Sequence, residues 1–337
     1  MFLKGRDLLS LNDLIDSELS ELIAFARELK SRFHAGEPMD FLMGAQIFSM
    51  DPEGLLGSWN PIAIGMTQLG GVCTDLGDGG LREELGETWL DRGRLLDLSG
   101  HGLAVTGRSV KWGHPFMEEL AAGLNSPVIN LMSDLAAPLQ AIASSMAVQE
   151  RLGEKMGEAR AAIVWAPPGR ATKPMSRPLS LAEILLRQGV AVRMACPLAF
   201  HPGAELADYL DAFLPGIFEI GEDPGEAIDG ADVVFSMNWA PDLRQHSLEE
   251  LAAIGSEHQG WRMEAEALEF AAPESLLGGG LPQNRDFEIQ GELLDGERSI
   301  HLEESANMLH VAKAVLALIL DPSIHGNVQE NHDSTIQ

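Results

Sequence analysis

The chain has 337 residues, of which 45% are hydrophobic and 22% are charged, which is enough for two domains that each have a core. Its 23 Lys and Arg residues are outnumbered by 51 Asp and Glu residues, giving a net charge of −28. Such a surface repels nucleic acid and anionic membranes, so neither is expected as a partner. A solvated acidic surface with no partner at all explains the charge equally well.

Cysteine usage and the chain ends set further bounds. Cys73 and Cys196 are too few for a disulfide framework, and neither they nor the histidines show the spacing of a metal site. No metal and no cofactor is therefore expected. The first residues lack the pattern of a signal peptide, and the apolar run 314–320 is far too short to span a bilayer. These features predict a soluble cytoplasmic protein.

Strands and helices alternate along the first 150 residues. Apolar residues at helical spacing predict a helix over 11–32. Asn60-Pro61 favours a helix start, because Asn is a good N-cap and Pro fits the first turn. A loop followed by a helix is expected over 77–94. Strands are expected at 45–50, 72–76, 102–106 and 128–131, and helices at 115–123 and 138–152.

The pattern restarts after Gly153. Strands are expected at 161–165, 191–196, 216–220 and 233–237, and helices at 179–188, 203–213 and 304–320. Strands that alternate with helices predict βαβ units and parallel sheets. We therefore expect an α/β protein with one domain over 1–150, completed by helix 304–320, and a second over 151–303. The polar residues 321–337 should form a frayed tail.

Several short segments, in the same order along nearly the whole chain, resemble the aspartate/ornithine carbamoyltransferases. They are Lys4–Leu11, Gln68–Gly71, Gly86–Asp91, Pro127–Asn130 followed by Pro138–Gln140, Gly230–Phe235, Trp261–Glu266, Leu281–Pro282 with Arg285, and Leu309–Leu318. The resemblance implies two doubly wound parallel-sheet domains, one for carbamoyl phosphate and one for an amino acid. It also implies transferase activity in amino-acid metabolism and a homotrimer.

Within that family, Trp165–Pro168 and Asn238–Ala240 look most like the N-acetylornithine and N-succinylornithine branch. In that branch the chain threads through a Pro-rich loop and forms a knot in the second domain. Residues 166–178 contain four prolines that would stiffen such a loop. The alternative is an ordinary Pro-rich surface turn.

The resemblance implies carbamoyl transfer. The active site for this reaction must hold a phosphate dianion and stabilise negative charge on the carbonyl oxygen. The family does this with Ser-x-Arg-Thr-Arg at a helix start, where arginines and helix amides grip the phosphate. The equivalent stretch here is Leu55–Trp59, and residues 33–81 contain no Lys or Arg. Ser58, Trp59 and Asn60 are the remaining candidates for donor binding.

Other family positions have also changed. Ala137 stands where the family has the His of His-Pro-x-Gln. Gly279 and Gly280 replace the His and Cys of His-Cys-Leu-Pro, and Met308 replaces an Arg before the motif of the last helix. Gln140 and Arg108 remain as catalytic and anion-binding candidates. The alternative for Arg108 is that it is an ordinary surface residue. The alternative for Gln140 is that it only forms local hydrogen bonds at a helix start.

The remaining candidates lie on the acceptor side and in the Pro-rich loop. The acceptor-binding candidates are Glu87, Asn238, Trp239, Leu281 and Arg285. Asn238 and Trp239 follow a buried strand, where α/β sheets place ligand groups. The alternatives are an exposed loop acid for Glu87 and packing for Trp239. The densest cationic patch in the chain is formed by Arg170, Lys173 and Arg177. Two interpretations are open: the patch attracts an anionic substrate, or it belongs to a solvated loop.

Two functions remain open. One is a family transferase acting on an amino acid or N-acyl amino acid, with its usual carbamoyl phosphate site eroded. The other is an inactive homologue that binds a small molecule or an active partner.

Overall fold

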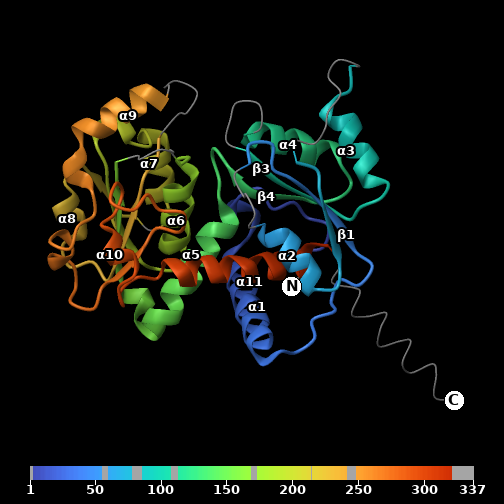
Figure 1. Ribbon diagram of the computed structural model, residues 1–337, viewed down its shortest axis with the longest axis horizontal. Helices are drawn as coiled ribbons and strands as arrows, with labels where there is room; N and C mark the ends of the chain where they lie inside the picture. The colour runs from blue at the N-terminus through green and yellow to red at the C-terminus, as the bar shows by residue number, and fades with distance from the viewer. Residues whose placement is uncertain are drawn as a thin grey trace. The chain divides into compact units, whose positions relative to one another are not determined.

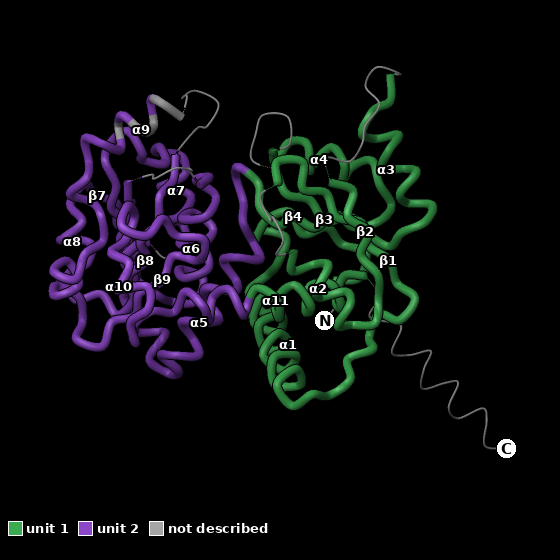
Figure 2. Tube along the Cα trace, viewed as in Figure 1, with its two compact units in different colours: residues 1–133, 308–337 green, residues 134–307 purple. Residues whose placement is uncertain are grey.

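The computed structural model describes residues 3–54, 60–77, 86–107, 113–167, 173–213, 215–240 and 248–320 (Figure 1). The chain forms two compact units, residues 1–133 with 308–337 (unit 1) and residues 134–307 (unit 2) (Figure 2). Each unit holds one parallel sheet with helices around it, which confirms the expected α/β fold. The predicted boundary at residue 150 stays a prediction; the division here precedes the helix that begins at Pro138.

Unit 1 contains a four-stranded sheet in the order β2-β1-β3-β4, with all neighbours parallel. The strands agree with the predicted ones to within two residues. They are β1 (Gln46–Met50), β2 (Val72–Asp75), β3 (Leu103–Gly107) and β4 (Val128–Ser133), and the helices are α1 (Asp16–Ala35), α2 (Pro61–Gln68), α3 (Trp89–Asp97) and α4 (His114–Gly123).

One face of the unit 1 sheet is covered by α3 and α4. Phe48 of β1 and Val105 of β3 pack there with Met117 of α4. The β1 and β3 strands are buried on both faces, as parallel strands covered by helices usually are. Because the strand order reverses between β1 and β3, ligand groups are expected beyond the carboxyl ends of these two strands.

Unit 2 contains a five-stranded parallel sheet in the order β7-β6-β5-β8-β9. Its switch point lies between β5 and β8. The strands are β5 (Arg160–Trp165), β6 (Ala191–Ala195), β7 (Phe218–Gly221), β8 (Val233–Met237) and β9 (Leu276–Gly278). The helices are α5 (Pro138–Leu152), α6 (Ser176–Arg187), α7 (Ala204–Asp211), α8 (Pro224–Ile228), α9 (Leu248–Glu257) and α10 (Gly291–Leu294). The last helix, α11 (His301–Ile319), begins in unit 2 and belongs to unit 1 from Met308 onward.

Strand β9 was not predicted, because its three residues merge into a run of glycines that resembles a loop. Its pairing with β8 brings the glycine segment to the carboxyl edge of the sheet, beside the end of β8. Helix α11 begins at His301, three residues before the predicted start. Of the helices described, none is long and apolar enough to cross a membrane.

Asn60 caps α2 as the sequence predicts. Its Oδ1 accepts hydrogen bonds from the backbone N–H groups of Ile62 (3.0 Å) and Ala63 (3.2 Å), and Pro61 occupies the first turn. These bonds satisfy two N–H groups that the helix itself leaves unpaired.

Lys313 places an ammonium group inside unit 1. Its side chain is fully buried, with Nζ 3.8 Å from Sδ of Met39 and 4.9 Å from the centre of the Phe33 ring. In the part of the chain that the structure describes, no carboxylate pairs with it. Burial lowers the pKa of Lys313 from 10.5 to about 8.

Replacing Lys313 with Met should therefore stabilise the protein at neutral pH. Below pH 8, Lys313 is protonated in both the folded and the unfolded state. Burial of the charge then destabilises only the folded state, by about 3 kcal/mol at most. Between about pH 8 and 10.5 the folded chain loses this proton before the unfolded chain does, so the stability of the wild type should rise. Urea unfolding at pH 7 and pH 10 should show a gain for Lys313→Met that shrinks at the higher pH.

The exposed Lys155 offers a matched control, since Lys155→Met removes the same charge without relieving burial. A loss of stability in Lys313→Met at pH 7 would contradict the interpretation.

Candidate functional site

Buried and partly buried polar side chains gather at the carboxyl edge of the unit 2 sheet. We call this group the unit 2 cluster. It contains Gln140, Lys173, Arg177, Asn238, Glu288 and Glu304. Asn238 directly follows β8 at the switch point, and Lys173 and Arg177 come from the segment that enters α6. The fold thus brings together four predicted site residues: Gln140, Lys173, Arg177 and Asn238.

Glu288 is fully buried and accepts four hydrogen bonds. Its Oε2 lies 3.1 Å from Nζ of Lys173 and 3.2 Å from the backbone nitrogen of Asn238. Its Oε1 accepts from the backbone N–H of Asn284 at 3.0 Å and from the side-chain amide of the same residue. Burial lowers the pKa of Lys173 to about 8, assisted by Arg177 and opposed by Glu288. Removing one partner of such a buried pair costs about 3–5 kcal/mol.

Glu304 fixes the glycine segment that follows β9. Its Oε2 accepts from the backbone N–H groups of Gly279 (3.1 Å) and Gly280 (2.9 Å), and its Oε1 accepts from the Ser144 hydroxyl (2.6 Å). The two glycines have φ angles of +144° and +65°, which other residues rarely adopt. The carboxylate therefore holds a turn that only glycine forms without strain.

Arg177 is buried, with 7% of its surface exposed. Its Nη2 donates to the carbonyl of Gly279 at 3.1 Å, whereas its buried Nε meets no hydrogen-bond acceptor in the described parts of the chain. Burial lowers the pKa of Arg177, and the nearby carboxylates of Glu288 and Glu304 oppose that shift. An arginine has five N–H donors and stays charged in proteins, so this side chain has unused capacity to bind an anion.

The absence of side chains at the two glycines also lets polar groups approach the backbone closely. A methyl group added at Gly280 would lie 2.6 Å from Nη2 of Arg177 and 2.7 Å from Nε2 of Gln140. At Gly279 it would lie 2.2 Å from the carbonyl oxygen of Ser236. Side chains at these two positions would displace the polar groups now there.

Three further buried polar atoms in this part of unit 2 have no partner among the described residues. They are Oγ of Ser236, Nδ2 of Asn238 and Oε1 of Gln283. Buried polar groups are usually satisfied, so their concentration here suggests places for water or ligand. Burial lowers the pKa of the neighbouring His301, with Lys173 and Arg177 adding to the shift and Glu304 opposing it.

Other predicted residues lie in different surroundings. Trp239 is fully buried, and its indole N–H donates to the carbonyl of Phe200 at 2.9 Å, which favours its packing alternative. Arg285 forms two bonds to Asp295 at 2.7 and 2.8 Å. Leu281 is 40% exposed.

Glu87 forms an ion pair with Arg92 at 2.9 Å near the start of α3, and Asn60 caps α2. Ser58, Trp59, Arg108 and Arg170 lie outside the described residues.

The interpretation of the Pro-rich loop as a solvated cationic patch is wrong for Lys173 and Arg177, which are largely buried. The loop meets the segment after β8 through a 2.9 Å bond from the Lys173 N–H to Oδ1 of Asn238 and a 3.1 Å bond from the Ala240 N–H to the Lys173 carbonyl. Residues 168–172 are not described, so the predicted knot stays a prediction.

Carboxylates occupy the corresponding edge of unit 1. Asp51 follows β1 and accepts a 2.6 Å hydrogen bond from the Thr106 hydroxyl on β3. Asp75 ends β2 and accepts from the N–H of Gly77 at 3.0 Å. Asp51 lies at the switch point and Asp75 ends the neighbouring edge strand β2, and both carboxylates disfavour the binding of a dianion nearby.

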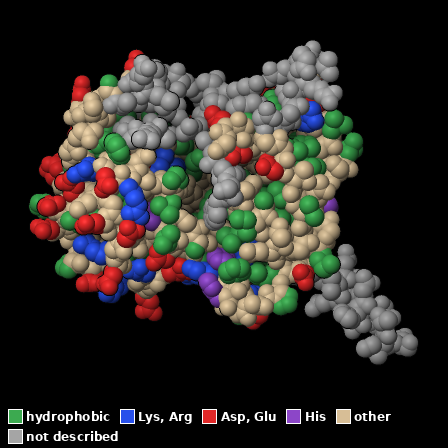
Figure 3. All heavy atoms as spheres, in the orientation of Figure 1, with side chains coloured by type: hydrophobic (Ala, Val, Ile, Leu, Met, Phe, Trp, Pro, Cys, Tyr) green, Lys and Arg blue, Asp and Glu red, His purple; other side chains and the backbone are tan. Residues whose placement is uncertain are grey.

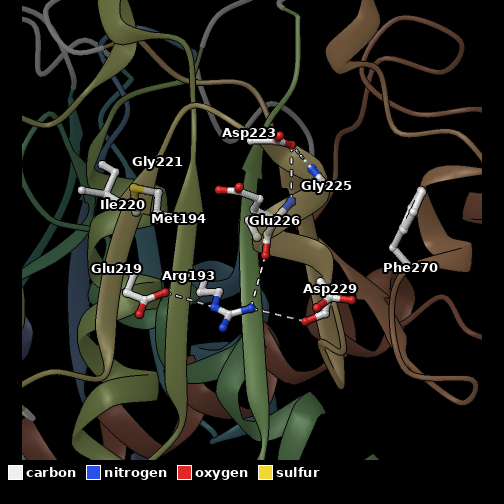
Figure 4. Close-up of a pocket in the computed structure, with 11 residues that line it drawn as sticks. Arg193, Met194, Glu219, Ile220, Gly221, Asp223, Gly225, Glu226, Asp229 and Phe270 are labelled. Atoms are coloured by element: carbon white, nitrogen blue, oxygen red, sulfur yellow. Dashed lines mark hydrogen bonds and ion pairs between the residues drawn. The ribbon is translucent and has the colours of Figure 1, made fainter.

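A separate hollow of about 550 Å³ lies in unit 2 between β6, β7 and α8 (Figure 4). Its Arg193 is held by Glu219 at 3.1 Å and donates to the carbonyls of Glu226 and Asp229 at 3.2 and 3.4 Å. No predicted site residue among those described lines this hollow. Its arginine is used structurally, so the hollow is a weaker candidate than the unit 2 cluster.

The face drawn in Figure 3 shows no comparable gathering of charged side chains. On the face in Figure 3, acidic side chains are spread out and mixed with Lys and Arg over unit 2. Among the residues described, no group of His, Cys, Asp and Glu has the arrangement of a metal site.

Sequence reasoning missed Glu288 and Glu304. Glu288 stands between Phe287 and Ile289. An acidic residue flanked by apolar residues, shortly after a run of glycines, was the signal in the sequence that pointed to its burial. Glu304 lies in the first turn of α11, where an acid is ordinarily attributed to the helix dipole.

Comparison with known proteins identifies the family. The model of the carbamoyl-P binding domain of aspartate/ornithine carbamoyltransferase matches residues 6–150, and that of the Asp/Orn binding domain matches residues 178–319. The ornithine carbamoyltransferase of Hyperthermus butylicus is 32% identical over 324 residues, covering 95% of this chain and 99% of that protein. That of Methanosarcina mazei is 29% identical and covers 94% and 99%.

Solved structures agree with these matches. Ornithine carbamoyltransferase from Pyrococcus furiosus superimposes with a TM-score of 0.84 at 25% identity, covering 95% of this chain and 98% of that one. An acetylornithine transcarbamylase complexed with acetylcitrulline shares the fold, with a TM-score of 0.83 at 20% identity over 94% and 99% of the two chains. Both domain models, the full-length relatives and the common fold lead to one conclusion: the chain belongs to the aspartate/ornithine carbamoyltransferase family.

Proposed function

We propose that this protein is a family transferase that acts on an amino acid or an N-acyl amino acid through unit 2, and that its usual carbamoyl phosphate site is eroded. The relatives named above are ornithine and acetylornithine transferases, which supports an acceptor of ornithine or arginine type. The observation that carries the proposal is the unit 2 cluster, with its largely buried Lys173–Glu288 pair and with an Arg177 Nε that has no partner among the described residues.

Erosion of the donor site is supported by sequence and by charge. Residues 33–81 contain no Lys or Arg, and Asp51 and Asp75 lie at the strand ends of unit 1. Each hydrogen bond to a charged group contributes about 1.5–3 kcal/mol, so losing an arginine pair removes several kcal/mol of phosphate binding. The amides at the start of α2 supply only a fraction of that charge.

The loss of these arginines equally favours a second candidate function. In it, the chain is an inactive homologue that binds a small amino-acid-like molecule or assembles with an active partner. The two candidates differ in turnover, which binding alone does not reveal.

Turnover can be tested by incubating the protein with carbamoyl phosphate and, in separate reactions, ornithine, N-acetylornithine and N-succinylornithine. Mass spectrometry should detect the carbamoylated acceptor in at least one reaction, and Gly280→Ala should reduce its formation. If some acceptors bind but none is ever modified, the inactive-homologue candidate replaces the transferase.

Carbamoyl phosphate itself should bind weakly. Calorimetric titration of the wild type is expected to give no saturable binding in the micromolar range, because the two arginines of the family's first motif are lacking. Inorganic phosphate serves as a reference for non-specific anion binding. A micromolar dissociation constant would contradict the eroded donor site.

Restoring the family residues should strengthen that binding. The triple variant Gly57→Arg, Trp59→Arg and Ala137→His is expected to raise carbamoyl phosphate affinity about 10- to 100-fold, since the start of α2 already supplies backbone donors. Turnover need not return, because Gly279, Gly280 and Met308 remain unchanged.

The matched control adds two arginines at exposed positions of α1, Ser17→Arg and Ser31→Arg, which change net charge without touching the helix start. Equal gains in both variants would indicate a general charge effect, and a folded triple variant with unchanged affinity would mean that the site serves another ligand.

We also propose a homotrimer, following the family. Packing surfaces do not depend on reacting groups, so assembly should persist even where the chemistry has changed. The Gly86–Asp91 segment, in which Glu87 pairs with Arg92, should lie near a neighbouring subunit. Light scattering should give three times the 36.4 kDa chain mass. A monomer across the accessible concentration range would contradict this prediction.

A further inference from the structure

Unit 1 holds a group of basic side chains where the end of α1 meets α11 (Figure 1). We call it the α1–α11 basic group, and it contains Lys30 and His34 of α1 and His310 and Lys313 of α11. Residues three or four apart lie on the same side of a helix, so each helix presents its two basic side chains together. The Phe33 ring lies among them, with its centre 5.6 Å from that of the His34 ring and 5.5 Å from that of the His310 ring. A seam between packed helices is ordinarily apolar, so this group needs an explanation.

Two of these side chains are buried without conventional hydrogen-bond acceptors. Lys313 has no exposed surface, and its ammonium group, which carries three N–H donors, contacts Sδ of Met39 at 3.8 Å and the Phe33 ring at 4.9 Å. His310 is 3% exposed, and its buried Nδ1 has no partner among the described residues. Buried polar groups are usually satisfied, and a thioether sulfur is only a weak acceptor. The two side chains therefore have unused capacity for an acceptor.

The charge around this position favours an anion over a metal ion. Burial lowers the pKa of His310 to about 3, and the charges of Lys313, Lys30 and His34 add to that shift. Among the described residues, no carboxylate opposes the lowered pKa of either His310 or Lys313. At neutral pH a protonated lysine thus lies near a neutral imidazole, which can donate a hydrogen bond through one nitrogen. A metal cation would be repelled by the two lysines, whereas an anion would be attracted.

Burial also limits the size and the charge of the anion. Lys313 and His310 are buried, while their neighbours Phe33 and His34 are exposed, so the group lies just beneath the surface. The unbranched Met39 side chain can adjust its rotamer to admit a small ion. Because the cost of desolvating an ion rises steeply with its charge, a monoanion is favoured over a phosphate or sulfate dianion.

We propose that Lys313 and His310 bind a small monoanion of the halide class between α1 and α11, with Lys30 and His34 adding to the positive potential around it. The site lies wholly in unit 1, and it is independent of the transfer reaction proposed above. The bound ion would offset the unfavourable burial of the Lys313 ammonium group. Chloride should therefore stabilise the folded chain.

Broadening of the chloride NMR signal tests binding directly, because an ion held by the protein relaxes faster than a free ion. The wild type should broaden the signal, and its net charge of −28 keeps non-specific chloride binding low. Bromide should compete for the site, whereas sulfate at the same ionic strength should not. Absence of broadening, or competition by sulfate as strong as that by bromide, would overturn the proposal.

Two variants test the residues. Lys313→Met should weaken chloride binding about 10-fold or more, because it removes a charge-assisted hydrogen bond. His310→Phe keeps a ring of similar size without nitrogen and should weaken binding about 5-fold. The exposed Lys155 again supplies the control, since Lys155→Met removes one charge elsewhere and should leave the broadening unchanged. Broadening by Lys313→Met equal to that by the wild type would overturn the site, and unchanged binding in His310→Phe would overturn the role of His310.

Stability supplies a second readout that does not depend on NMR. Sodium chloride at ten times its dissociation constant should raise the melting temperature of the wild type by about 2 °C more than sodium gluconate of the same ionic strength. This difference should vanish in Lys313→Met, because chloride stabilises only a protein that binds it. Equal effects of the two salts on the wild type, or the same chloride-specific gain in Lys313→Met, would overturn the proposal.

Discussion

The contact on which the candidate site depends is the pair of hydrogen bonds from Gly279 and Gly280 to one carboxylate oxygen of Glu304. This carboxylate comes from the first turn of α11 and reaches the segment that follows β9, so it joins the last helix to the sheet edge within unit 2. Ser144 of α5 supplies the third bond. Since the turn has φ angles suited to glycine, and its carbonyl accepts from Arg177, the position of the guanidinium follows from the position of the turn.

Buried charge of this kind is seldom favourable for stability alone. A buried ion pair roughly breaks even against apolar side chains of the same size, because desolvation offsets the attraction. Unit 2 places two carboxylates, a lysine and an arginine in one buried region, and leaves several polar atoms there without described partners. The apolar core that includes Val164, Val234 and Leu277 already supports the sheet. The cluster therefore fits the acceptor site proposed above better than a contribution to folding alone.

Much of the fold could be predicted from the sequence, because buried parallel strands and amphipathic helices leave periodic patterns. Strand β9 escaped prediction because three residues beside glycines carry too little pattern, and its identity comes from pairing with β8. Gln140, Asn238, Lys173 and Arg177 could be nominated from motif positions and loop charge. Their meeting in one buried cluster depends on tertiary contacts, and so does the burial of two residues that resembled a solvated patch. Glu288 and Glu304 were missed for the same reason: nothing local distinguishes a buried acid from a solvated one.

The described residues at the two sheet edges differ in charge although both units are built in the same way: carboxylates alone in unit 1, and two carboxylates with two cations in unit 2. In unit 1, the described strand ends carry Asp51 and Asp75, and no Lys or Arg occurs between residues 33 and 81. In unit 2, Arg177 and Lys173 lie at the switch-point edge. The fold depends on apolar cores that tolerate many sequences, whereas the affinity for an anion depends on a few charged side chains at a strand end. A family fold can thus persist while the place that attracts an anion changes.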